Sequence, residues 1–513
     1  MVYSLPEKVF LLHPDDDVAV AQETLPAGTR LREGQRVWEL ATEVPRGHKI
    51  ALRPLPAGAP VHKYGQVIGF ATRPIASGEH VHTHNLGLGE LTAAGEFGTA
   101  VRPVEYVPEG ERCTFEGFLR PDGRAGTRNY VLVLATTNCS AFVARAIAEQ
   151  FREAPRDYPQ VDGVAALTHA GGCGSQLGGE GYHQLQRTLA GYAHHPNVAG
   201  CLLVGLGCEV NQAAALLAGT QLGALPPSQQ PALVTVQECG GTQKAIAAGR
   251  RVVQRLLARA NECRRQRLPA SYLVLATECG GSDAYSGITA NPAVGAAADE
   301  LVRQGGTVIL AETPEMYGAA HLLTSRAVSR EVGEALLERL RWWEEYAARE
   351  GATLDNNPTP GNRAGGLTTI YEKALGAIAK GGTTPLRAVY RYGERISETG
   401  LVVMDTPGYD PPSVTGMVAG GANLIVFTTG RGSVYGCKPV PSLKVASTTQ
   451  LYEHLSADMD VNAGVILEGA TVAEVGEQIF AELLQVASGK RTKSELLGIG
   501  EEEFCPWLLG PTL

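Results

Sequence analysis

The first part of the chain alternates short apolar runs with turn residues. Up to about residue 86 these runs are four to seven residues long, as in VFLLHP, DVAVA, KIALRPL and GQVIGFA, and phrases such as PAG, PRG and ASG separate them. This pattern is typical of β-strands joined by tight turns. It predicts a small, mostly β domain over 1–90. The Pro-, Gly- and Glu-rich stretch that follows predicts a connector over 91–116.

After the connector, continuous apolar runs alternate with longer helical stretches. NYVLVLATT, GCLLVGLG, SYLVLATE and NLIVFTT are apolar throughout, as expected for parallel strands that are covered on both faces. NYVLVLATTNCSA is similar to SYLVLATECGGSD, which indicates two related halves. We therefore predict an α/β fold class, with two Rossmann-like parallel-sheet halves over 117–268 and 269–490 and a C-terminal tail over 491–513.

Composition and charge exclude several classes of protein. Lys and Arg total 44 against 53 Asp and Glu, a net charge of −9, and the basic residues are scattered, so no nucleic-acid partner is expected. No apolar run approaches the roughly 20 residues that span a bilayer, and the N-terminus lacks a signal-peptide pattern. Ten cysteines are few for a disulfide scaffold of 513 residues. We expect a soluble, cytoplasmic protein with reduced thiols and no membrane partner.

Cysteines and acids stand where the predicted strands end. In open α/β sheets ligands bind at the carboxyl ends of strands. Convergent thiolates suit a soft metal such as iron, alone or in a cluster, whereas a lone cysteine is more often a small core residue. Acids there either cap the following helix or serve a metal or acid–base site. The cysteines are Cys139, Cys173, Cys208, Cys239 and Cys279, and the acids are Glu209, Glu238, Glu278, Asp283 and Glu312.

One glycine turn suits an anion, and none suits a dinucleotide. In FTTGRGS, backbone N–H groups with Thr428, Thr429 and Arg431 can hold a carboxylate, although a purely structural turn is the alternative. GLGCEV and GRGSVY both lack the third glycine of G-x-G-x-x-G. A nicotinamide-dependent oxidoreductase is therefore disfavoured.

Histidines gather in the predicted β domain. His82 and His84 share one face of an extended strand, where they are either metal ligands or exposed residues. His13 precedes an acidic run, and His48 precedes Lys49. A histidine or lysine with a pKa near 7 can serve as a general base.

Longer strings resemble a known family over nearly the whole chain. HPDDDVAVA, RGHKIAL, KYGQVIGFA and GEHVHTHN resemble its small SAF-type β module. GRAGTRN, NCSA, GGCGSQ, GLGCEVNQ, ECGGSDAYSGITANPAVG, AETPEMYGA and NNPTPGNRAGGLTT resemble the remainder. The chain thus resembles the altronate/galactarate dehydratases, a family that also contains the sulfolactate sulfo-lyases. HVHTHN, EMYGA and RYGER are closer to the altronate branch, whereas Asp16 and GCKPVP depart from the family pattern.

The resemblance implies dehydration of a small-molecule sugar acid, altronate first, to a 2-keto-3-deoxy acid. It also implies a divalent metal, Fe(II) or another, while the convergent cysteines leave an iron–sulfur cluster as an alternative. The proton at C2 is weakly acidic, so such enzymes combine a metal with a Lys or His base. Galactarate dehydration and sulfite elimination from 3-sulfolactate are the alternative reactions, and a non-catalytic sugar-acid sensor is a different class. Self-association into a homo-oligomer is a further expectation.

Residue roles follow as hypotheses. We assign iron binding to the cysteines, with His13 as a further candidate ligand. A base in the β module exchanges the C2 proton. An acid either assists departure of the 3-hydroxyl or completes the metal site. The metal set is His13, Cys139, Cys173, Cys208 and Cys279; the base is His48 or Lys49; the acid is Glu209, Asp283 or Glu312; and Ser282, Asn362, Thr429 and Arg431 hold substrate.

Overall fold

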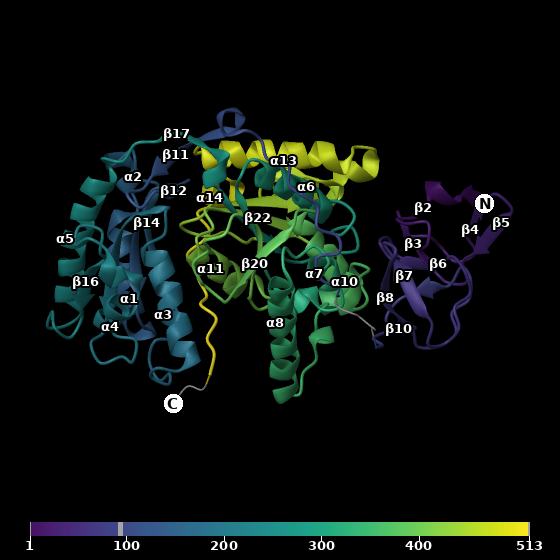
Figure 1. Ribbon diagram of the computed structural model, residues 1–513, viewed down its shortest axis with the longest axis horizontal. Coiled ribbons are helices and arrows are strands. Elements are labelled where there is room, and N and C mark those ends of the chain that lie inside the picture. The colour runs from purple at the N-terminus through teal and green to yellow at the C-terminus, as the bar shows by residue number, and fades with distance from the viewer. Residues whose placement is uncertain (1, 91–95, 511–513) are drawn as a thin grey trace.

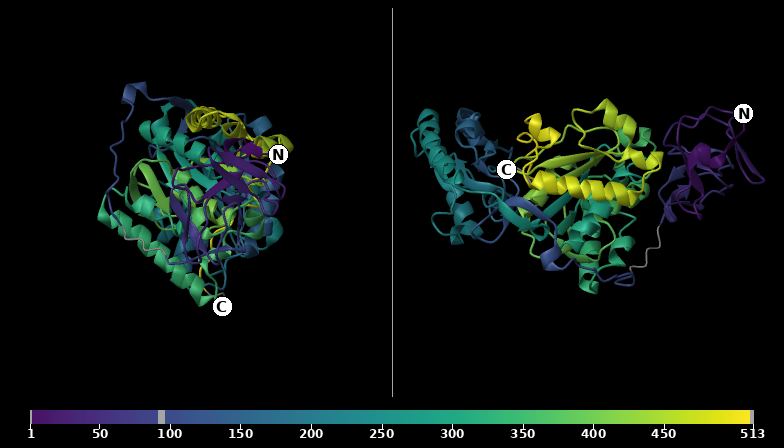
Figure 2. Two further views of the ribbon diagram at one scale, coloured as in Figure 1. Left: turned by 90° about the vertical axis from the view of Figure 1, so that its right-hand side faces the viewer. Right: turned by 90° about the horizontal axis from the view of Figure 1, so that it is seen from above.

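Three domains lie in a row in the computed structural model, which describes residues 2–90 and 96–510 (Figure 1). The C-terminal domain is in the centre, the N-terminal β domain is on one side of it, and the middle domain is on the other; the view from above shows the same order (Figure 2). Residues 91–95 of the predicted connector and 511–513 of the predicted tail lie outside the described residues.

The N-terminal domain is built of three small sheets with strand orders β2-β3-β6-β9, β1-β4-β5 and β10-β8-β7. Its repeated turn phrases put Gly28, Gly58 and Gly78 at φ of 78°, 79° and 80°, a region that glycine enters without steric cost. The strands are β1 (Val2–Ser4), β2 (Val9–Phe10), β3 (Val18–Ala21), β4 (Arg30–Glu33), β5 (Arg36–Glu39), β6 (Lys49–Ala51), β7 (Pro60–Lys63), β8 (Gln66–Ala71), β9 (His80–Val81) and β10 (Leu86–Gly87).

The middle domain holds a four-stranded parallel sheet of order β14-β13-β15-β16. Helices α1 and α5 pack on one face of this sheet and α3 on the other, so its central strands are apolar on both faces. The elements are β13 (Tyr130–Ala135), α1 (Ala141–Ala148), α2 (Ala154–Asp157), β14 (Gly163–Leu167), α3 (Glu180–Ala193), β15 (Val198–Gly205), α4 (Ala213–Gly219), β16 (Ala232–Thr235) and α5 (Thr242–Ala260).

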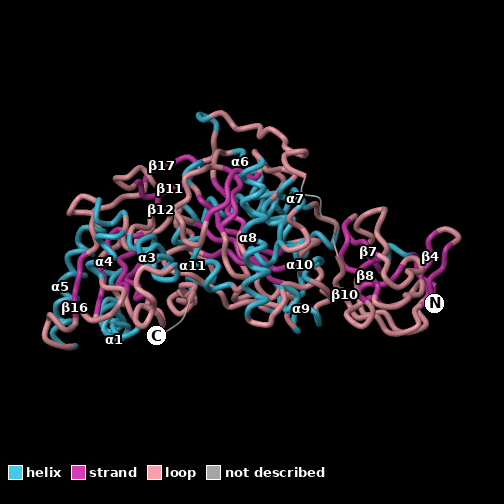
Figure 3. Tube along the Cα trace, turned by 60° about the horizontal axis from the view of Figure 1, so that its bottom comes forward, coloured by secondary structure: helices cyan, strands magenta, loops and turns pink. Residues whose placement is uncertain are grey.

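The C-terminal domain holds a seven-stranded parallel sheet of order β20-β21-β19-β18-β22-β23-β24. Strands, drawn in magenta, lie in the middle of the molecule with cyan helices around them (Figure 3). Helices α6, α10 and α13 cover one face and α11 covers the other. The strands are β18 (Val274–Cys279), β19 (Thr307–Leu310), β20 (Leu386–Tyr390), β21 (Gly400–Met404), β22 (Leu424–Thr429), β23 (Ser442–Ala446) and β24 (Val461–Asn462). The helices are α6 (Ala290–Arg303), α7 (His321–Thr324), α8 (Arg330–Arg349), α9 (Pro360–Ala364), α10 (Ile370–Ile378), α11 (Asp410–Gly420), α12 (Thr449–His454), α13 (Val472–Ala487) and α14 (Lys493–Leu496).

The domains share continuous packing. Helices α3 and α11 touch so closely that a Cβ at Gly191 would lie 2.2 Å from the Ala419 carbonyl oxygen. Strands β11 (Thr114–Leu119), β12 (Ala125–Gly126) and β17 (Gln266–Pro269) form a small antiparallel sheet at the domain crossover. One apolar core also runs from the N-terminal domain into the C-terminal domain. The predicted mixed α/β architecture behind a β domain is therefore observed. Among the described residues, every helix is too short or too polar to cross a membrane.

Candidate active site and metal-ligand groups

The loop that follows β18 carries a fixed, buried carboxyl group. Asp283 Oδ1 accepts hydrogen bonds from the Tyr285 and Ser286 N–H groups at 3.0 and 2.8 Å, and from the Ser286 hydroxyl at 3.0 Å. Ser447 Oγ donates to the same oxygen at 3.2 Å. Burial raises the pKa of Asp283, while these hydrogen bonds oppose the rise. Of the three predicted acids, Asp283 is therefore held in one orientation at a strand end.

The predicted substrate-holding residues differ in whether their side chains already form hydrogen bonds within the protein. Ser282 Oγ is buried without a hydrogen-bond partner among the described residues, so it can receive a ligand. Asn362 Nδ2 donates to the Ser282 carbonyl oxygen at 2.8 Å. Thr429 Oγ1 accepts from the Gly432 N–H at 3.0 Å, and Arg431 is exposed. Asn362 and Thr429 therefore shape the loops, whereas Ser282 has free bonding capacity.

A small cavity brings the N-terminal and C-terminal domains together at this loop. Its lining includes Tyr64 from the β7–β8 turn, Cys279 and Ser282 from the β18 end, and Glu372 and Lys373 from α10. Tyr285 strengthens the docking, since its hydroxyl donates to the Ala21 carbonyl oxygen at 2.8 Å. The cavity is thus closed by both domains.

Beside the cavity, Cys279 lies in a cluster of buried charges. Its thiol donates to Glu312 Oε2 at 3.5 Å, and burial raises the pKa of Cys279, so the group remains a thiol. Lys380 Nζ donates to Glu312 at 3.0 Å, and Lys373 Nζ donates to Glu315 at 2.7 Å. Cys279, Glu312 and Glu315 offer ligand atoms within 4.8 Å of one another, as a metal site would require.

Two further carboxyl groups extend this cluster and hold protons. Glu278 and Asp410 adjoin Glu312, and the three present ligand atoms within 4.8 Å. Burial and the charge of Glu312 raise the pKa of Glu278 well above its ordinary value and that of Asp410 to about 7. Glu312 itself has φ of 63°, a strained conformation for a non-glycine residue. The cluster is therefore a buried store of protons near neutral pH.

A second buried charge cluster joins the β module to α10. Lys49 Nζ and Lys63 Nζ each lie 2.8 Å from a Glu372 carboxylate oxygen, and all three side chains are buried. Lys49 also donates to the Gly366 carbonyl oxygen at 2.7 Å. Burial lowers the pKa of Lys49 to about 8, whereas the attraction of Glu372 raises that of Lys63 despite its burial. Lys49 is thus the lysine of this pair that releases a proton near neutrality.

Three histidines form a compact group beside Lys49. His48 Nδ1 lies 3.0 Å from His80 Nε2, and the ring centroids of His48 and His82 are 4.6 Å apart. Ring nitrogens of the three residues lie within 4.8 Å of one another. Burial lowers the pKa of His80 to about 4 and that of His82 to about 3, and also lowers that of His48. The rings are therefore neutral at pH 7, the form that binds metal ions.

The other predicted residues lie elsewhere. Cys139, Cys173 and Cys208 are exposed at the carboxyl end of the middle-domain sheet, so the structure separates them from Cys279. Beside them Glu209 is buried, and its carboxylate is held by hydrogen bonds from Thr136 Oγ1 at 2.9 Å and from the Leu206 and Gly207 N–H groups. His13 is exposed in the β module, and its Nδ1 accepts from the Asp15 N–H at 3.2 Å.

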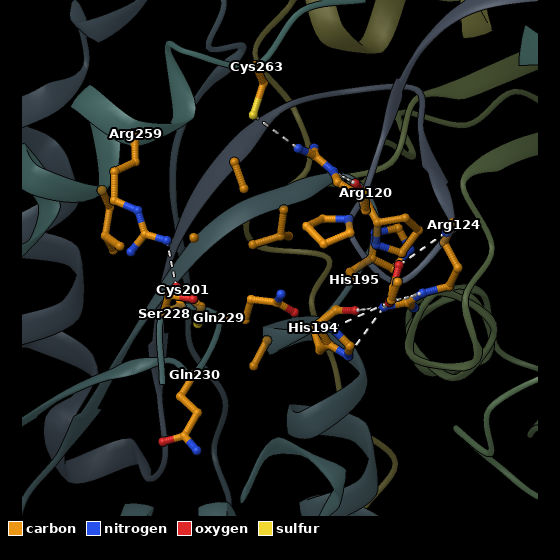
Figure 4. A pocket seen from close by; sticks show the side chains of 18 of the residues that line it. Arg120, Arg124, His194, His195, Cys201, Ser228, Gln229, Gln230, Arg259 and Cys263 are labelled. Carbon is orange, nitrogen blue, oxygen red and sulfur yellow. Dashed lines mark hydrogen bonds and ion pairs between the residues drawn. The ribbon is translucent and has the colours of Figure 1, made fainter. Parts of the chain in front are cut away.

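A separate cavity of about 360 Å³ lies at the amino end of the middle-domain sheet (Figure 4). Its cationic side chains are already engaged. Arg120 donates to the Pro196 carbonyl oxygen at 2.6 Å and to Cys263 Sγ at 3.6 Å, and Arg259 donates to the Ser228 carbonyl oxygen at 2.6 Å. This cavity is therefore braced by structural hydrogen bonds and is distinct from the strand ends.

Sequence reasoning missed the partners that complete the clusters. Glu372, Lys373 and Lys380 lie on or just after α10, which reads as an ordinary core helix, and Asp410 begins α11. His80 is one of the histidines that gather in the β module, and no sequence pattern assigns it a role. The sequence does carry one signal, because Glu372, Lys373 and Lys380 lie within nine positions of an otherwise apolar stretch. Charged groups are rarely buried unless they are paired, so such a stretch indicates buried ion pairs.

Models of known protein families match each of the three domains. Three family models match in succession: an altronate/galactarate dehydratase SAF domain over residues 7–88, a D-galactarate dehydratase/altronate hydrolase second domain over 117–261, and a D-galactarate/altronate dehydratase C-terminal domain over 270–512. Galactarate dehydratase (L-threo-forming) of Escherichia coli K12 is 39% identical over 94% of this chain and 92% of its own length. The chain belongs to the galactarate/altronate dehydratase family.

Other members of the family show its range. Altronate dehydratase of Bacillus subtilis 168 is 34% identical over 94% of this chain and 96% of its own length. The (2R)-sulfolactate sulfo-lyase subunit beta of Chromohalobacter salexigens is 32% identical over 75% of this chain and 95% of its own length. Among solved structures, carbon monoxide dehydrogenase IV from Carboxydothermus hydrogenoformans aligns over 76% of this chain and 64% of its own, at 10% identity. The TM-score of 0.16 is too low to carry an argument.

Proposed function

We propose that this dehydratase-family chain removes water from a sugar acid, altronate or galactarate, to give a 2-keto-3-deoxy acid. The observation that carries the proposal is the small closed cavity between the β module and the C-terminal domain. Its lining residue Glu372 holds the proton-releasing Lys49, and its lining residue Asp283 is a carboxyl group whose pKa burial raises. This pairing fits β-elimination, which removes a proton at C2 and returns one to the hydroxyl that leaves C3.

The residues present fit a divalent metal ion at the histidine group. His82 Nδ1 is buried without a hydrogen-bond partner among the described residues, which is the condition of a ligand atom awaiting an ion. His48, His80 and His82 would hold the ion, with Fe(II) as our first choice. When bound, it supplies Lewis-acid stabilisation of the negative charge that develops on the substrate carboxylate.

In this proposal Lys49 exchanges the C2 proton. Its neighbour His48, the other predicted base, belongs to the metal-binding group and is engaged there. Lys49 is held by Glu372 and by the Gly366 carbonyl oxygen, and its pKa of about 8 leaves a useful fraction of free amine at neutral pH. Lys63, whose pKa is raised, keeps Glu372 paired when Lys49 is neutral.

The leaving hydroxyl takes its proton from the C-terminal domain. Asp283 faces the cavity, and burial raises its pKa, so we assign it to the 3-hydroxyl. Glu278 and Asp410 form the proton store behind it. Ser282, with its free hydroxyl, binds the substrate. The enol that remains after loss of water takes a proton at C3 and becomes the 2-keto-3-deoxy acid.

Anaerobic turnover in D2O with added Fe(II) tests the function. D-altronate and galactarate are supplied separately, and the 2-keto-3-deoxy acid is quantified together with deuterium at its C3. We expect product from at least one acid with deuterium incorporated. Release of sulfite from 3-sulfolactate instead would move the reaction to the sulfo-lyase branch. Ligand binding without any turnover would favour a sensor.

The histidine group is tested by a matched pair within the HVHTH phrase. His82→Ala removes a member of the group, whereas His84→Ala removes an exposed histidine two residues away. We expect loss of bound Fe(II) and at least about 100-fold lower turnover in the first variant only. Equal metal content in the two variants would refute the assignment of the metal to this group.

The substrate is not decided by relatedness alone. Identity is 39% to a galactarate dehydratase and 34% to altronate dehydratases, while the HVHTHN, EMYGA and RYGER strings favour altronate. The two acids differ at C6, which carries a carboxylate only in galactarate. The ratio of the two kcat/KM values therefore assigns the substrate, and we expect altronate to be preferred.

A further inference from the structure

The four parallel strands of the middle-domain sheet each end in a loop that carries one cysteine. Cys173 follows β14, Cys139 follows β13, Cys208 follows β15 and Cys239 follows β16, in the spatial order of the strands. The carboxyl ends of parallel strands meet at one edge, so the sheet places the four residues at a single edge. Cys239 was the cysteine left out of the metal hypothesis, and it takes the place of Cys279.

Hydrogen bonds connect these loops into one surface. The Asn138 N–H donates to the Gly171 carbonyl oxygen at 3.0 Å, which joins the loops of Cys139 and Cys173. The Asn211 N–H donates to the Gly172 carbonyl oxygen at 3.0 Å, which joins the loops of Cys173 and Cys208. Gln237 Nε2 donates to Cys208 Sγ at 3.4 Å, which joins the loops of Cys208 and Cys239. All four loops are therefore neighbours.

The surroundings of the thiols are unlike those of structural cysteines. Cys139, Cys173 and Cys208 are exposed, although free cysteine is among the most buried residue types. Apolar side chains stand open beside them, with Phe142 64% exposed and Leu177 72% exposed. Exposed thiols next to exposed apolar groups indicate a surface that a further component covers.

Glycines shape the loops for close approach. Gly172, Gly174 and Gly207 have φ of 96°, 73° and 126°, conformations that other residues rarely adopt. Gly172 and Gly174 flank Cys173, and Gly207 precedes Cys208. A Cβ at Gly172 would lie 2.2 Å from the Thr136 carbonyl oxygen, so this loop must stay against the end of β13. The backbone thus lets the loops of Cys173 and Cys208 pack closely at this edge.

We propose that Cys139, Cys173, Cys208 and Cys239 hold an iron–sulfur cluster at the carboxyl edge of the middle-domain sheet. The four ligands come from four separate loops, unlike the paired C-x2–4-C spacing of structural zinc sites. This site is separate from the histidine group and from Cys279, and it does not depend on the proposed reaction. Assembly takes Fe(II), Fe(III) and sulfide from solution in the proportion that the resting cluster holds, so that no electron is gained or lost, and the cysteine thiols lose their protons to solvent as they bind iron.

Anaerobic reconstitution of the full-length protein with Fe(II), Fe(III) and sulfide tests this inference. Iron and acid-labile sulfide are quantified after desalting, with visible absorption and EPR of the dithionite-reduced sample. We expect iron and sulfide in stoichiometric amounts, together with the broad visible absorption of a thiolate-bound cluster. Retention of zinc, or of iron without sulfide, would overturn the proposal.

Matched variants locate the cluster. Cys173→Ala and Cys208→Ala should lose most of the labile sulfide, and Cys505→Ala, which removes an exposed cysteine from the C-terminal segment, should keep it. His82→Ala should also keep its sulfide while losing the metal of the histidine group. Circular dichroism confirms that each variant is folded. Full sulfide in Cys173→Ala and Cys208→Ala, or equal loss in Cys505→Ala, would refute the assignment.

Discussion

At the scale of single residues, the two lysines that contact Glu372 have pKa values shifted in opposite directions. Both contact the same carboxylate, yet burial lowers the pKa of Lys49 to about 8 while that of Lys63 is raised. We expect Lys49→Arg to reduce exchange of the substrate C2 proton at least about 100-fold, since arginine cannot release a proton. Lys63→Arg should reduce the same exchange less than about tenfold, because arginine keeps a positive charge beside Glu372. NMR of substrate in D2O measures the exchange, and equal losses would contradict the assignment of the base.

Asp410 gives a second prediction at this scale, in the pH profile. The Lys49 ammonium group loses its proton and becomes a free amine as the pH rises through about 8. The Asp410 carboxyl group loses its proton as the pH rises through about 7. The kcat/KM profile should therefore be bell-shaped, with its maximum midway between these values. Asp410→Asn is neutral at every pH and should remove the alkaline fall that Asp410 causes. An unchanged alkaline limb in this variant would exclude Asp410 from the proton store.

The same scale shows what a sequence can predict about a site. Strand-end positions predicted that Cys279, Asp283 and Glu312 lie at one edge of the C-terminal sheet, because parallel strands fix where a loop must lie, and their roles stay predictions. The partners could not be found in this way: Lys49 meets Glu372 across 323 positions of sequence. Such a pair exists only because the β module docks against α10, a tertiary contact that no local pattern encodes.

At the scale of elements, the docking of the β module depends on the glycine turn after α9. Gly366 has φ of 101°, and a Cβ there would lie 2.4 Å from the Gly47 carbonyl oxygen, one residue before His48. We expect Gly366→Ala to separate the β module from the turn and to lower kcat/KM at least about tenfold, because Lys49 loses its hold on the Gly366 carbonyl oxygen.

A control with similar backbone strain separates docking from folding. Gly351 also has positive φ, but a Cβ there would meet no atom within 4 Å. Gly351→Ala should therefore retain activity while it shows the cost of strain alone. Limited proteolysis in the 96–116 connector should accelerate only in Gly366→Ala. Equal activity in both variants would show that the turn does not position the site.

The elements themselves were more predictable than their assembly. Apolar runs located β13, β15, β18 and β22, since strands that are covered on both faces must be apolar throughout. Turn phrases likewise marked the glycines of the β module. The spatial order of the domains was not predictable, because it depends on the packing of α3 against α11 and on the core that the β module shares with the C-terminal domain.

At the scale of the whole molecule, buried neutral histidines make the fold sensitive to acid. His195 Nε2 donates to the Ala422 carbonyl oxygen at 2.9 Å and its Nδ1 accepts from the Asn197 N–H; His169 bonds in the same way to Ala135 and Gly171. Burial lowers the pKa of His169 to about 4 and that of His195 to about 3. A proton on Nδ1 would break the accepting bond, so the folded protein resists protonation.

The sign of the pH dependence follows from these depressed pKa values. Unfolded histidine binds its proton near pH 6.5, so the stabilising contribution is present above that pH and is lost as the pH falls towards the folded values. Between pH 6.5 and 5 each of the two residues removes roughly 2 kcal/mol from the free energy of unfolding. Calorimetry should show the melting temperature falling over this window by less than the two histidines alone would give, because Asp410, whose pKa is raised to about 7, takes up a proton in the fold and offsets part of the loss. His195→Gln keeps a donor for Ala422 and should give a shallower fall than the native chain, whereas equal slopes in the two proteins would mean that His195 does not resist protonation in the fold.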